Sequence, residues 1–132
     1  MNTFNTVLLI DDNEFDNLLN EKLIRASKFA DNIIAVQSSE EALTLLRNEK
    51  RGNNPMPDVI FLDIRMPLGD GFEFLKEYQT LPSRIINKTK VVMLTSSLDE
   101  DDYLQAIHNK FVKFLLNKPL SFKLLDDLKK KL

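Results

Sequence analysis

The chain has 132 residues, which is the size of one domain and enough to bury a sizeable hydrophobic core without disulfides or a structural metal. Its formal net charge of −2 gives no electrostatic basis for nucleic-acid binding, and the absence of cysteine excludes a disulfide framework and a thiolate metal site. No stretch approaches the roughly 18 consecutive apolar residues of a transmembrane helix, and the start lacks the positive charge of a secretory leader. We therefore expect a soluble cytoplasmic protein that binds neither nucleic acid nor membranes.

Short apolar runs alternate with segments of helical spacing along the whole chain. We interpret the apolar runs as buried strands, and they cover residues 7–10, 33–36, 57–63, 91–94 and 111–116. The helical segments begin at Glu14, run from Ser38 to near Lys50, from Phe72 to before Pro82 and from Ser97 through Ile107, and close the chain around Leu124 to Leu132. Residues 51–57 are rich in polar, Gly and Pro residues and are expected to form a loop, whereas residues 82–90 are ambiguous.

Local signals support several of these boundaries. In the first helix the apolar residues recur on one face, as in an amphipathic helix (Phe15, Leu18, Leu19, Leu23 and Ala26). Ser38 with Glu41 and Ser97 with Glu100 have the spacing of capping boxes. Lys113 interrupts the last apolar run, which indicates an edge strand with one side in solvent.

Five strands that alternate with five helices predict an α/β fold with a doubly wound, five-stranded parallel sheet. A strand as apolar as 57–63 is covered on both faces, which is typical of parallel sheets. In such sheets ligands bind beyond the carboxyl ends of the strands. Polar residues at those ends are therefore the candidates for a functional site.

Three carboxylates occupy such positions. Asp11 and Asp12 follow the first strand, and Asp63 ends the third. If the strand order is 2-1-3-4-5, the first and third strands are neighbours about 4.8 Å apart, so the three side chains converge. Carboxylates that close repel one another unless a cation lies among them, and Mg²⁺ suits a site of carboxylates, waters and phosphate oxygens.

Two further residues complete the predicted site. Thr95 ends the fourth strand and Lys118 follows the fifth, within reach of Asp63 for a lysine side chain. Three acids, one hydroxyl and one ammonium group suit phosphoryl transfer to a carboxylate. Asp63 would attack, Mg²⁺ would neutralise the phosphoryl oxygens, and Thr95 and Lys118 would donate hydrogen bonds to the others.

In this pattern the chain resembles the receiver domains of two-component response regulators, which have a flavodoxin-like fold, and the single-domain chemotaxis regulators among them. The resemblance covers essentially the whole chain. It is carried by the acid pair after the first strand, the residues around Asp63, a glycine-rich turn, a threonine after the fourth strand and a lysine–proline pair after the fifth (Asp11-Asp12, Leu62-Asp63-Ile64-Arg65-Met66-Pro67, Gly69-Asp70-Gly71, Thr95 and Lys118-Pro119). Five such features in order make the resemblance specific.

The resemblance implies a flavodoxin-like sheet of order 2-1-3-4-5 and a signalling switch rather than an enzyme. Asp63 would accept a phosphoryl group from a sensor histidine kinase or a histidine phosphotransfer protein. Asp12 and Asp63 would bind Mg²⁺ directly, Asp11 mainly through water, and Arg65 through its main-chain carbonyl. A cis peptide would precede Pro119.

We also expect residues 1–132 to form one receiver domain without an output domain. The phosphorylated chain would then signal by docking on a downstream protein, by passing the phosphoryl group on or by forming a phosphorylation-dependent homodimer, and these alternatives stay open. One feature departs from the family. Receivers usually carry an aromatic residue three positions before the lysine, where this chain has Leu115, and Phe114 should face the opposite side of the sheet.

Each residue alone has an ordinary structural explanation. Asp11 to Asn13 can cap a helix, Asp63 can end a turn, and His108 suits the negative end of a helix dipole. Phe72, Phe74 and Leu75 are expected in the core. A weaker hypothesis is that Arg65 and Ser97 flank the phosphoryl group and adjust its lifetime.

Three other functions share part of this pattern. A non-phosphorylated interaction module of the same fold is favoured only if Leu115 marks a disabled switch. A flavin- or nucleotide-binding enzyme of flavodoxin type needs a phosphate cradle after the first strand, where this chain has two acids that would repel phosphate. A phosphatase of the haloacid-dehalogenase type needs an Asp-x-Asp motif, and Asp63-Ile64-Arg65 lacks the second acid.

Overall fold

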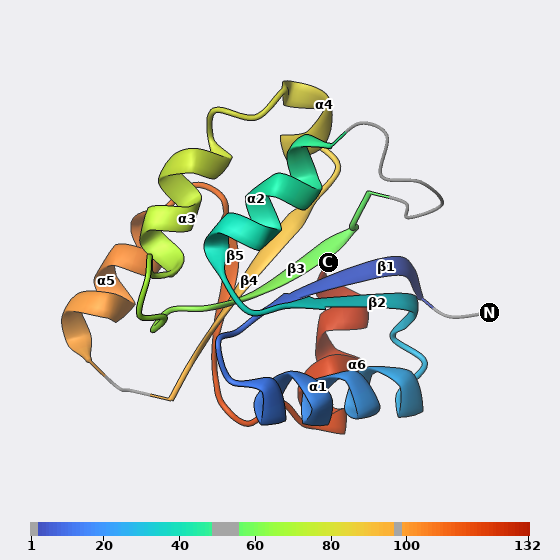
Figure 1. The fold of residues 1–132 in the computed structure, drawn as a ribbon. Coiled ribbons are helices and arrows are strands. Elements are labelled where there is room, and N and C mark those ends of the chain that lie inside the picture. Colours follow the sequence, from blue (N-terminus) through green and yellow to red (C-terminus); the bar gives the residue numbers. More distant parts are fainter. Residues whose placement is uncertain (1–2, 49–55, 97–98) are drawn as a thin grey trace.

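The computed structural model describes residues 3–48, 56–96 and 99–132, and these form a three-layer α/β sandwich (Figure 1). The five strands are parallel and lie in the order β2-β1-β3-β4-β5, which confirms the predicted order. The strands are β1 (Phe4–Ile10), β2 (Ala30–Val36), β3 (Val59–Asp63), β4 (Lys90–Thr95) and β5 (Val112–Asn117). The helices are α1 (Glu14–Ala26), α2 (Ser39–Arg47), α3 (Gly71–Tyr78), α4 (Ser83–Ile86), α5 (Glu100–His108) and α6 (Phe122–Lys131).

The described residues therefore contain six helices, whereas the sequence predicted five. The additional helix, α4, is a single turn that follows Pro82 within the ambiguous stretch. Such a turn is too short to display the periodicity from which the other helices were inferred. It spans the connection from α3 to β4.

The helices cover the two faces of the sheet. Figure 1 shows α2, α3 and α5 on one face and α1 and α6 on the other. Side chains alternate along each strand, so neighbouring residues of β3 enter different cores: Ile60 and Leu62 pack beneath α2 and α3, and Val59 and Phe61 pack with α1 and α6. All five residues of β3 are buried, as the apolar run predicted.

The packed face of α1 differs from the one that its apolar residues suggest. Phe15, Leu18 and Leu19 are 64%, 48% and 45% exposed, whereas the helix buries Ile24 together with the polar residues Asn17 and Asn20. An exposed apolar strip thus runs along the first half of α1. We call Phe15, Leu18 and Leu19 the α1 strip.

Asn17 explains this orientation. Its side-chain amide donates hydrogen bonds to the main-chain carbonyls of Asp11 (3.0 Å) and Val36 (3.2 Å), at the ends of β1 and β2. Buried carbonyl groups at strand ends need a donor, and an amide on the inner face of α1 supplies it. The need of these carbonyl groups for hydrogen bonds therefore orients the helix, rather than the pattern of its apolar residues.

The structure confirms some of the other local predictions and differs from others. Ser38 accepts a hydrogen bond from the main-chain N–H of Glu41 (3.1 Å), so the predicted cap of α2 is present. The N-cap of α5 is Asp99, not Ser97, which lies outside the described residues. The predicted loop at 51–57 also lies largely outside them. Lys113 is exposed on the edge strand β5, as expected.

Candidate functional site

The ends of β1 and β3 bring the predicted acids together. Ile10 is paired with Leu62 in the parallel register, so the residues that follow, Asp11 and Asp63, occupy equivalent positions at the carboxyl edge of the sheet. Carboxylate oxygens of Asp11, Asp12 and Asp63 all lie within 4.8 Å of one another. The three acids that the sequence predicted to converge do so.

Asp63 is 5% exposed at the floor of this cluster. Its pKa is raised from 3.8 to about 6, first because burial disfavours the charged carboxylate and second because Asp11 is negatively charged. Lys118 and a hydrogen bond from the Arg65 main chain act in the opposite direction. At neutral pH the carboxylate is therefore largely ionised, in a site that favours a cationic partner.

Among the described residues, Lys118 is the lysine whose ammonium group lies beside the acid cluster. Its Nζ lies 2.7 Å from Asp11 Oδ2 and 3.4 Å from Asp63 Oδ1. Burial would lower the pKa of Lys118, but the hydrogen bond to Asp11 and the charges of Asp63 and Asp11 outweigh it, so the pKa is raised. The ammonium group is held protonated beside the acids. The peptide bond between Lys118 and Pro119 is cis, as the resemblance implied.

The position of Lys118 follows from the sheet. Thr95 pairs with Asn117 in the register of β4 and β5, and the main-chain N–H of Lys118 donates to the carbonyl of Thr95 (2.7 Å). Thr95 itself is buried at the end of β4, one residue beyond the Asp63 and Leu94 pair. Thr95 and Lys118 therefore both come to the edge at which Asp63 ends.

A fourth acid, Asp16 of α1, was not predicted. Its Oδ2 lies 3.3 Å from Lys118 Nζ, so Lys118 contacts one acid after β1, one at the end of β3 and one in α1. In the sequence Asp16 has the pattern of an ordinary acidic residue in the first turn of a helix, where it complements the dipole. Only the packing of α1 beside the end of β5 gives it a second role.

Arg65 also has a partner that the sequence did not indicate. Its guanidinium forms an ion pair with Asp102 of α5. Its main-chain N–H hydrogen-bonds to the Asp63 carboxylate. The residue thus connects the loop after Asp63 to the first turn of α5.

The glycine-rich turn is held tightly against Asp63. A Cβ at Gly71 would lie 2.7 Å from the Asp63 carbonyl oxygen and 2.8 Å from Met93 Cε, and Gly69 has φ +122°. The main-chain N–H of Gly71 donates to Ile64 (2.9 Å), and Asp70 caps α3 by accepting from Glu73 (2.9 Å). The turn requires glycine here because its backbone packs directly on the residue that carries the site.

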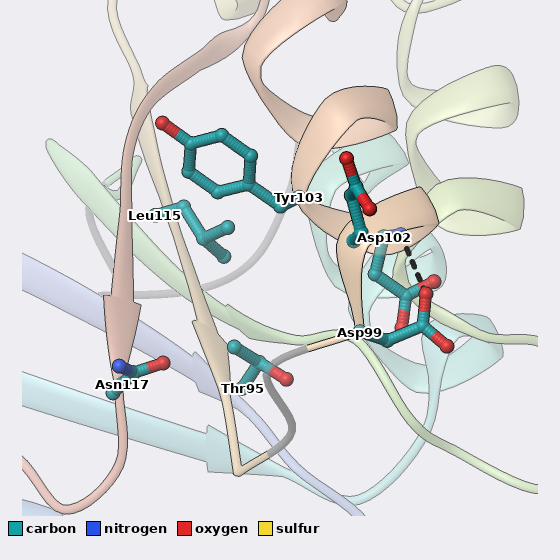
Figure 2. A pocket seen from close by; sticks show the side chains of 7 residues that line it. Thr95, Asp99, Asp102, Tyr103, Leu115 and Asn117 are labelled. Carbon is teal, nitrogen blue, oxygen red and sulfur yellow. Dashed lines mark hydrogen bonds between the residues drawn. The ribbon is translucent and has the colours of Figure 1, made fainter.

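Leu115 and Phe114 point to opposite faces of β5, as predicted. Leu115 packs on the side of α2, α3 and α5, and Phe114 packs with the core beneath α1 and α6. A cavity of about 330 Å³ lies between β4, β5 and α5. Figure 2 shows Tyr103 of α5 reaching toward Leu115 over this cavity, with Thr95 at its base (residues lining it: Thr95, Asp99, Glu100, Asp102, Tyr103, Leu115 and Asn117).

The donor set fits a magnesium ion. Hard oxygen ligands are present in three carboxylates, two of them buried, while a single lysine offsets their charge within the described part of the chain. The exposed carboxylate of Asp12 leaves a route for waters, which Mg²⁺ retains in its coordination shell. Asp11, Asp12 and Asp63 could therefore hold the ion.

Comparison with known proteins agrees with this geometry. Residues 7–129 match the response regulator receiver domain family. The chain belongs to that family. This receiver domain is 32% identical over 124 residues to the probable methanogenesis regulatory protein FilR2 of Methanothrix harundinacea, which covers 94% of this chain and 76% of that protein. It is 30% identical over 101 residues to the response regulator Rcp1 of Synechocystis, covering 76% of this chain and 67% of Rcp1.

Solved structures agree with the fold of the receiver. The crystal structure of a two-component response regulator from Cytophaga hutchinsonii superposes with a TM-score of 0.85 at 34% identity, covering 96% of this chain and 95% of that one. The receiver also matches part of a probable histidine kinase 2 of Oryza sativa subsp. indica, at 29% identity over 107 residues, 76% of this chain and 10% of that protein. Membership of the receiver domain family supports a phosphoacceptor role in two-component signalling. Receiver domains in general act as signalling switches. None of the helices in the described ranges is long and apolar enough to cross a bilayer.

Proposed function

We propose that this receiver accepts a phosphoryl group on Asp63 in a magnesium-dependent reaction and relays the signal through a changed surface. The observation that carries the proposal is the convergence of Asp63 with Asp11, Asp12 and Lys118 at one edge of the sheet. The donor is a phosphohistidine of a sensor kinase or of a histidine phosphotransfer protein. The phosphorus–oxygen bond to Asp63 forms as the phosphorus–nitrogen bond breaks, and the imidazole leaves with the electron pair of that bond.

Each residue has a role in this proposal. The Asp63 carboxylate is the nucleophile and needs no general base, because a group with a pKa of about 6 is mostly ionised at pH 7. Lys118 and Thr95 would bind phosphoryl oxygens, and Lys118 would exchange part of its contact with Asp63 for the new oxygens. Asp11, Asp12, Asp63 and the main-chain carbonyl of Arg65 would hold Mg²⁺. When bound, the ion would neutralise charge on the transferring phosphoryl group.

The α1 strip supports a protein donor. Phe15, Leu18 and Leu19 are exposed on the helix that starts directly after Asp11 to Asn13, so a protein seated on them would lie beside the carboxylates. Exposed apolar groups at helical spacing suit packing against the helices of a partner. We therefore propose that the histidine-bearing donor docks here.

The test uses acetyl phosphate and Mg²⁺ with intact-mass measurement. We expect the native chain to gain the mass of one phosphoryl group and Asp63→Asn to gain none. Asp31→Asn, an exposed acid on β2, is the matched control and should be phosphorylated as the native chain is. An adduct on Asp63→Asn, or no adduct on the native chain with Mg²⁺ present, would refute the proposal.

A non-phosphorylated interaction module of the same fold remains the alternative, since Leu115 stands where receivers usually have an aromatic residue. The same mass measurement separates the two functions. A module of that kind would keep its acid cluster but would gain no phosphoryl group from any phosphoryl donor.

A further inference from the structure

The cavity beside Leu115 lacks the aromatic residue from β5 that receivers usually have at this position. Leu115 of β5 lines it with an aliphatic side chain, and the aromatic ring beside it belongs to Tyr103 of α5 (Figure 2). A contact that joins Asp63 to α5 would therefore give the signal a route to this surface. The question is which contact joins α5 to the phosphorylation site.

The ion pair of Arg65 with Asp102 makes that connection. Arg65 follows Asp63 by two residues, and its main-chain N–H already hydrogen-bonds to the Asp63 carboxylate. Its guanidinium forms the ion pair with Asp102 in the first turn of α5. One residue thus contacts the phosphoacceptor through its backbone and α5 through its side chain.

Asp102 depends on this contact. Its side chain is 13% exposed, whereas that of Arg65 is 58% exposed. The carboxylate also follows three other acids, Asp99, Glu100 and Asp101, at the start of the helix. A nearly buried carboxylate that loses its cation is strongly disfavoured, so the turn that carries it must rearrange until the group reaches water.

A phosphoryl group on Asp63 would compete for the same guanidinium. It carries nearly two negative charges and three acceptor oxygens, and the planar fork of arginine binds phosphate with two parallel hydrogen bonds. Asp102 offers a single carboxylate charge. The balance for Arg65 therefore favours the phosphoryl group once it is present.

We propose that phosphorylation of Asp63 transfers the Arg65 guanidinium from Asp102 to the phosphoryl group and thereby releases the first turn of α5. The inference rests on the phosphoacceptor role proposed above. Tyr103, the residue after Asp102, moves with that turn over Leu115. In this scheme Arg65 supplies a route to the α5 surface that does not need an aromatic residue at position 115.

The experiment measures the phosphoryl adduct and the mobility of α5 in the same samples. Acetyl phosphate with Mg²⁺ activates the chain, intact mass reports the adduct, and amide hydrogen exchange reports residues 99–108. We expect activation of the native chain to speed exchange in the first turn of α5 about tenfold, as for the loss of one charge-assisted hydrogen bond. Asp102→Asn should exchange at that faster rate before activation and gain little on activation, while still forming the adduct. Arg65→Ala should likewise exchange at the faster rate before activation.

Two further variants sharpen the result. Asp101→Asn removes a neighbouring, exposed acid of the same turn and should respond to activation as the native chain does. Tyrosine fluorescence gives a second signal, since the chain has no tryptophan and only two tyrosines, of which Tyr78 is buried. The fluorescence change on activation should disappear in Tyr103→Phe while the change in exchange remains.

The possible failures are distinguishable. If no adduct forms on the native chain, the phosphoacceptor role and this inference fall together. If the adduct forms but exchange in α5 is unchanged, only the inference is overturned. The same holds if phosphorylation speeds exchange in Asp102→Asn by as much as in the native chain.

Discussion

Asp63 combines burial with a negative charge that its proposed role as phosphoacceptor needs. Its pKa of about 6 results mainly from burial and next from the charge of Asp11. Because this pKa is higher in the folded chain than the ordinary value of 3.8, protonation of Asp63 stabilises the fold. That contribution is complete below about pH 4 and is lost as the pH rises through about 6. At pH 7 the ionised residue therefore reduces stability.

Replacing Asp63 with asparagine should raise the free energy of unfolding. Without Mg²⁺ at pH 7.5 we expect a gain on the order of 2 kcal/mol, because the variant keeps the shape of the side chain without its charge. The gain should shrink toward zero near pH 4, where Asp63 is protonated in the folded chain. Urea unfolding followed by circular dichroism at both pH values measures this. A gain of equal size at both would show that burial of charge is not its cause.

Lys118 should matter more for the rate of phosphorylation than for binding of the donor. Lys118→Met removes a positive charge 3.4 Å from Asp63, so the pKa of Asp63 should rise further and the incoming phosphoryl oxygens should lose a donor. We expect adduct formation from acetyl phosphate at pH 7 to slow by roughly a hundredfold. The time course of intact mass provides the rate.

The matched control for Lys118 is Lys113→Met, which removes an exposed lysine of the same strand region. It should be phosphorylated at the native rate. Equal rates in the two variants would contradict a specific role for Lys118.

At the scale of elements, one face of α1 packs on the sheet and another face is exposed for a partner. Its inner face uses the Asn17 amide to satisfy carbonyls of β1 and β2, and this leaves the α1 strip in solvent. Exposed apolar residues contribute little to the stability of the fold. Their energetic value should appear only when a partner covers them.

The variant Leu19→Ser tests this division. We expect its unfolding free energy to stay within about 0.5 kcal/mol of the native value, since Leu19 is 45% exposed. Phosphotransfer from a cognate histidine-bearing donor should fall about tenfold through weaker docking, while acetyl phosphate should act at the native rate. The comparison of the two donors is the measurement.

Ile107→Ser is the control for the α1 strip, because Ile107 has similar exposure (51%) but lies on α5, on the other face of the sheet. It should receive the phosphoryl group from the protein donor normally. A matching loss in both variants would indicate a general effect of exposed apolar residues.

At the scale of the whole molecule, the site exists only when the sheet is assembled. Asp11 and Asp12 follow β1, Asp63 ends β3, Thr95 ends β4 and Lys118 follows β5. The unfolded chain cannot hold these groups together. Any ligand of the site therefore stabilises the complete fold rather than one element.

Magnesium should accordingly raise the melting temperature of the native chain. At a concentration one hundred times Kd the stabilisation should be about 2.7 kcal/mol. Asp63→Asn and Asp12→Asn should respond much less, because each removes an oxygen charge from the cluster. Calorimetry with and without Mg²⁺ tests this, and addition of EDTA should reverse the change. An equal rise in all three proteins would point to nonspecific ion binding.

The sequence by itself determined the strands, the long helices, the parallel sheet and the candidate residues at its edge. It could do so because apolar periodicity and residues at strand ends are local patterns, and because Asp11, Asp63, Thr95 and Lys118 each stand directly after such a pattern. The convergence of the acids then required only the strand order, which the structure confirms.

Tertiary structure alone decided the rest. The orientation of α1 depends on carbonyls at two strand ends to which the Asn17 amide donates once the helix is packed. The contact of Asp16 with Lys118 joins residues 102 positions apart. The ion pair of Arg65 with Asp102 likewise spans 37 positions. Such pairings leave no periodic trace in a sequence, because each partner alone has the pattern of an ordinary surface charge, and only the packed chain brings them within reach.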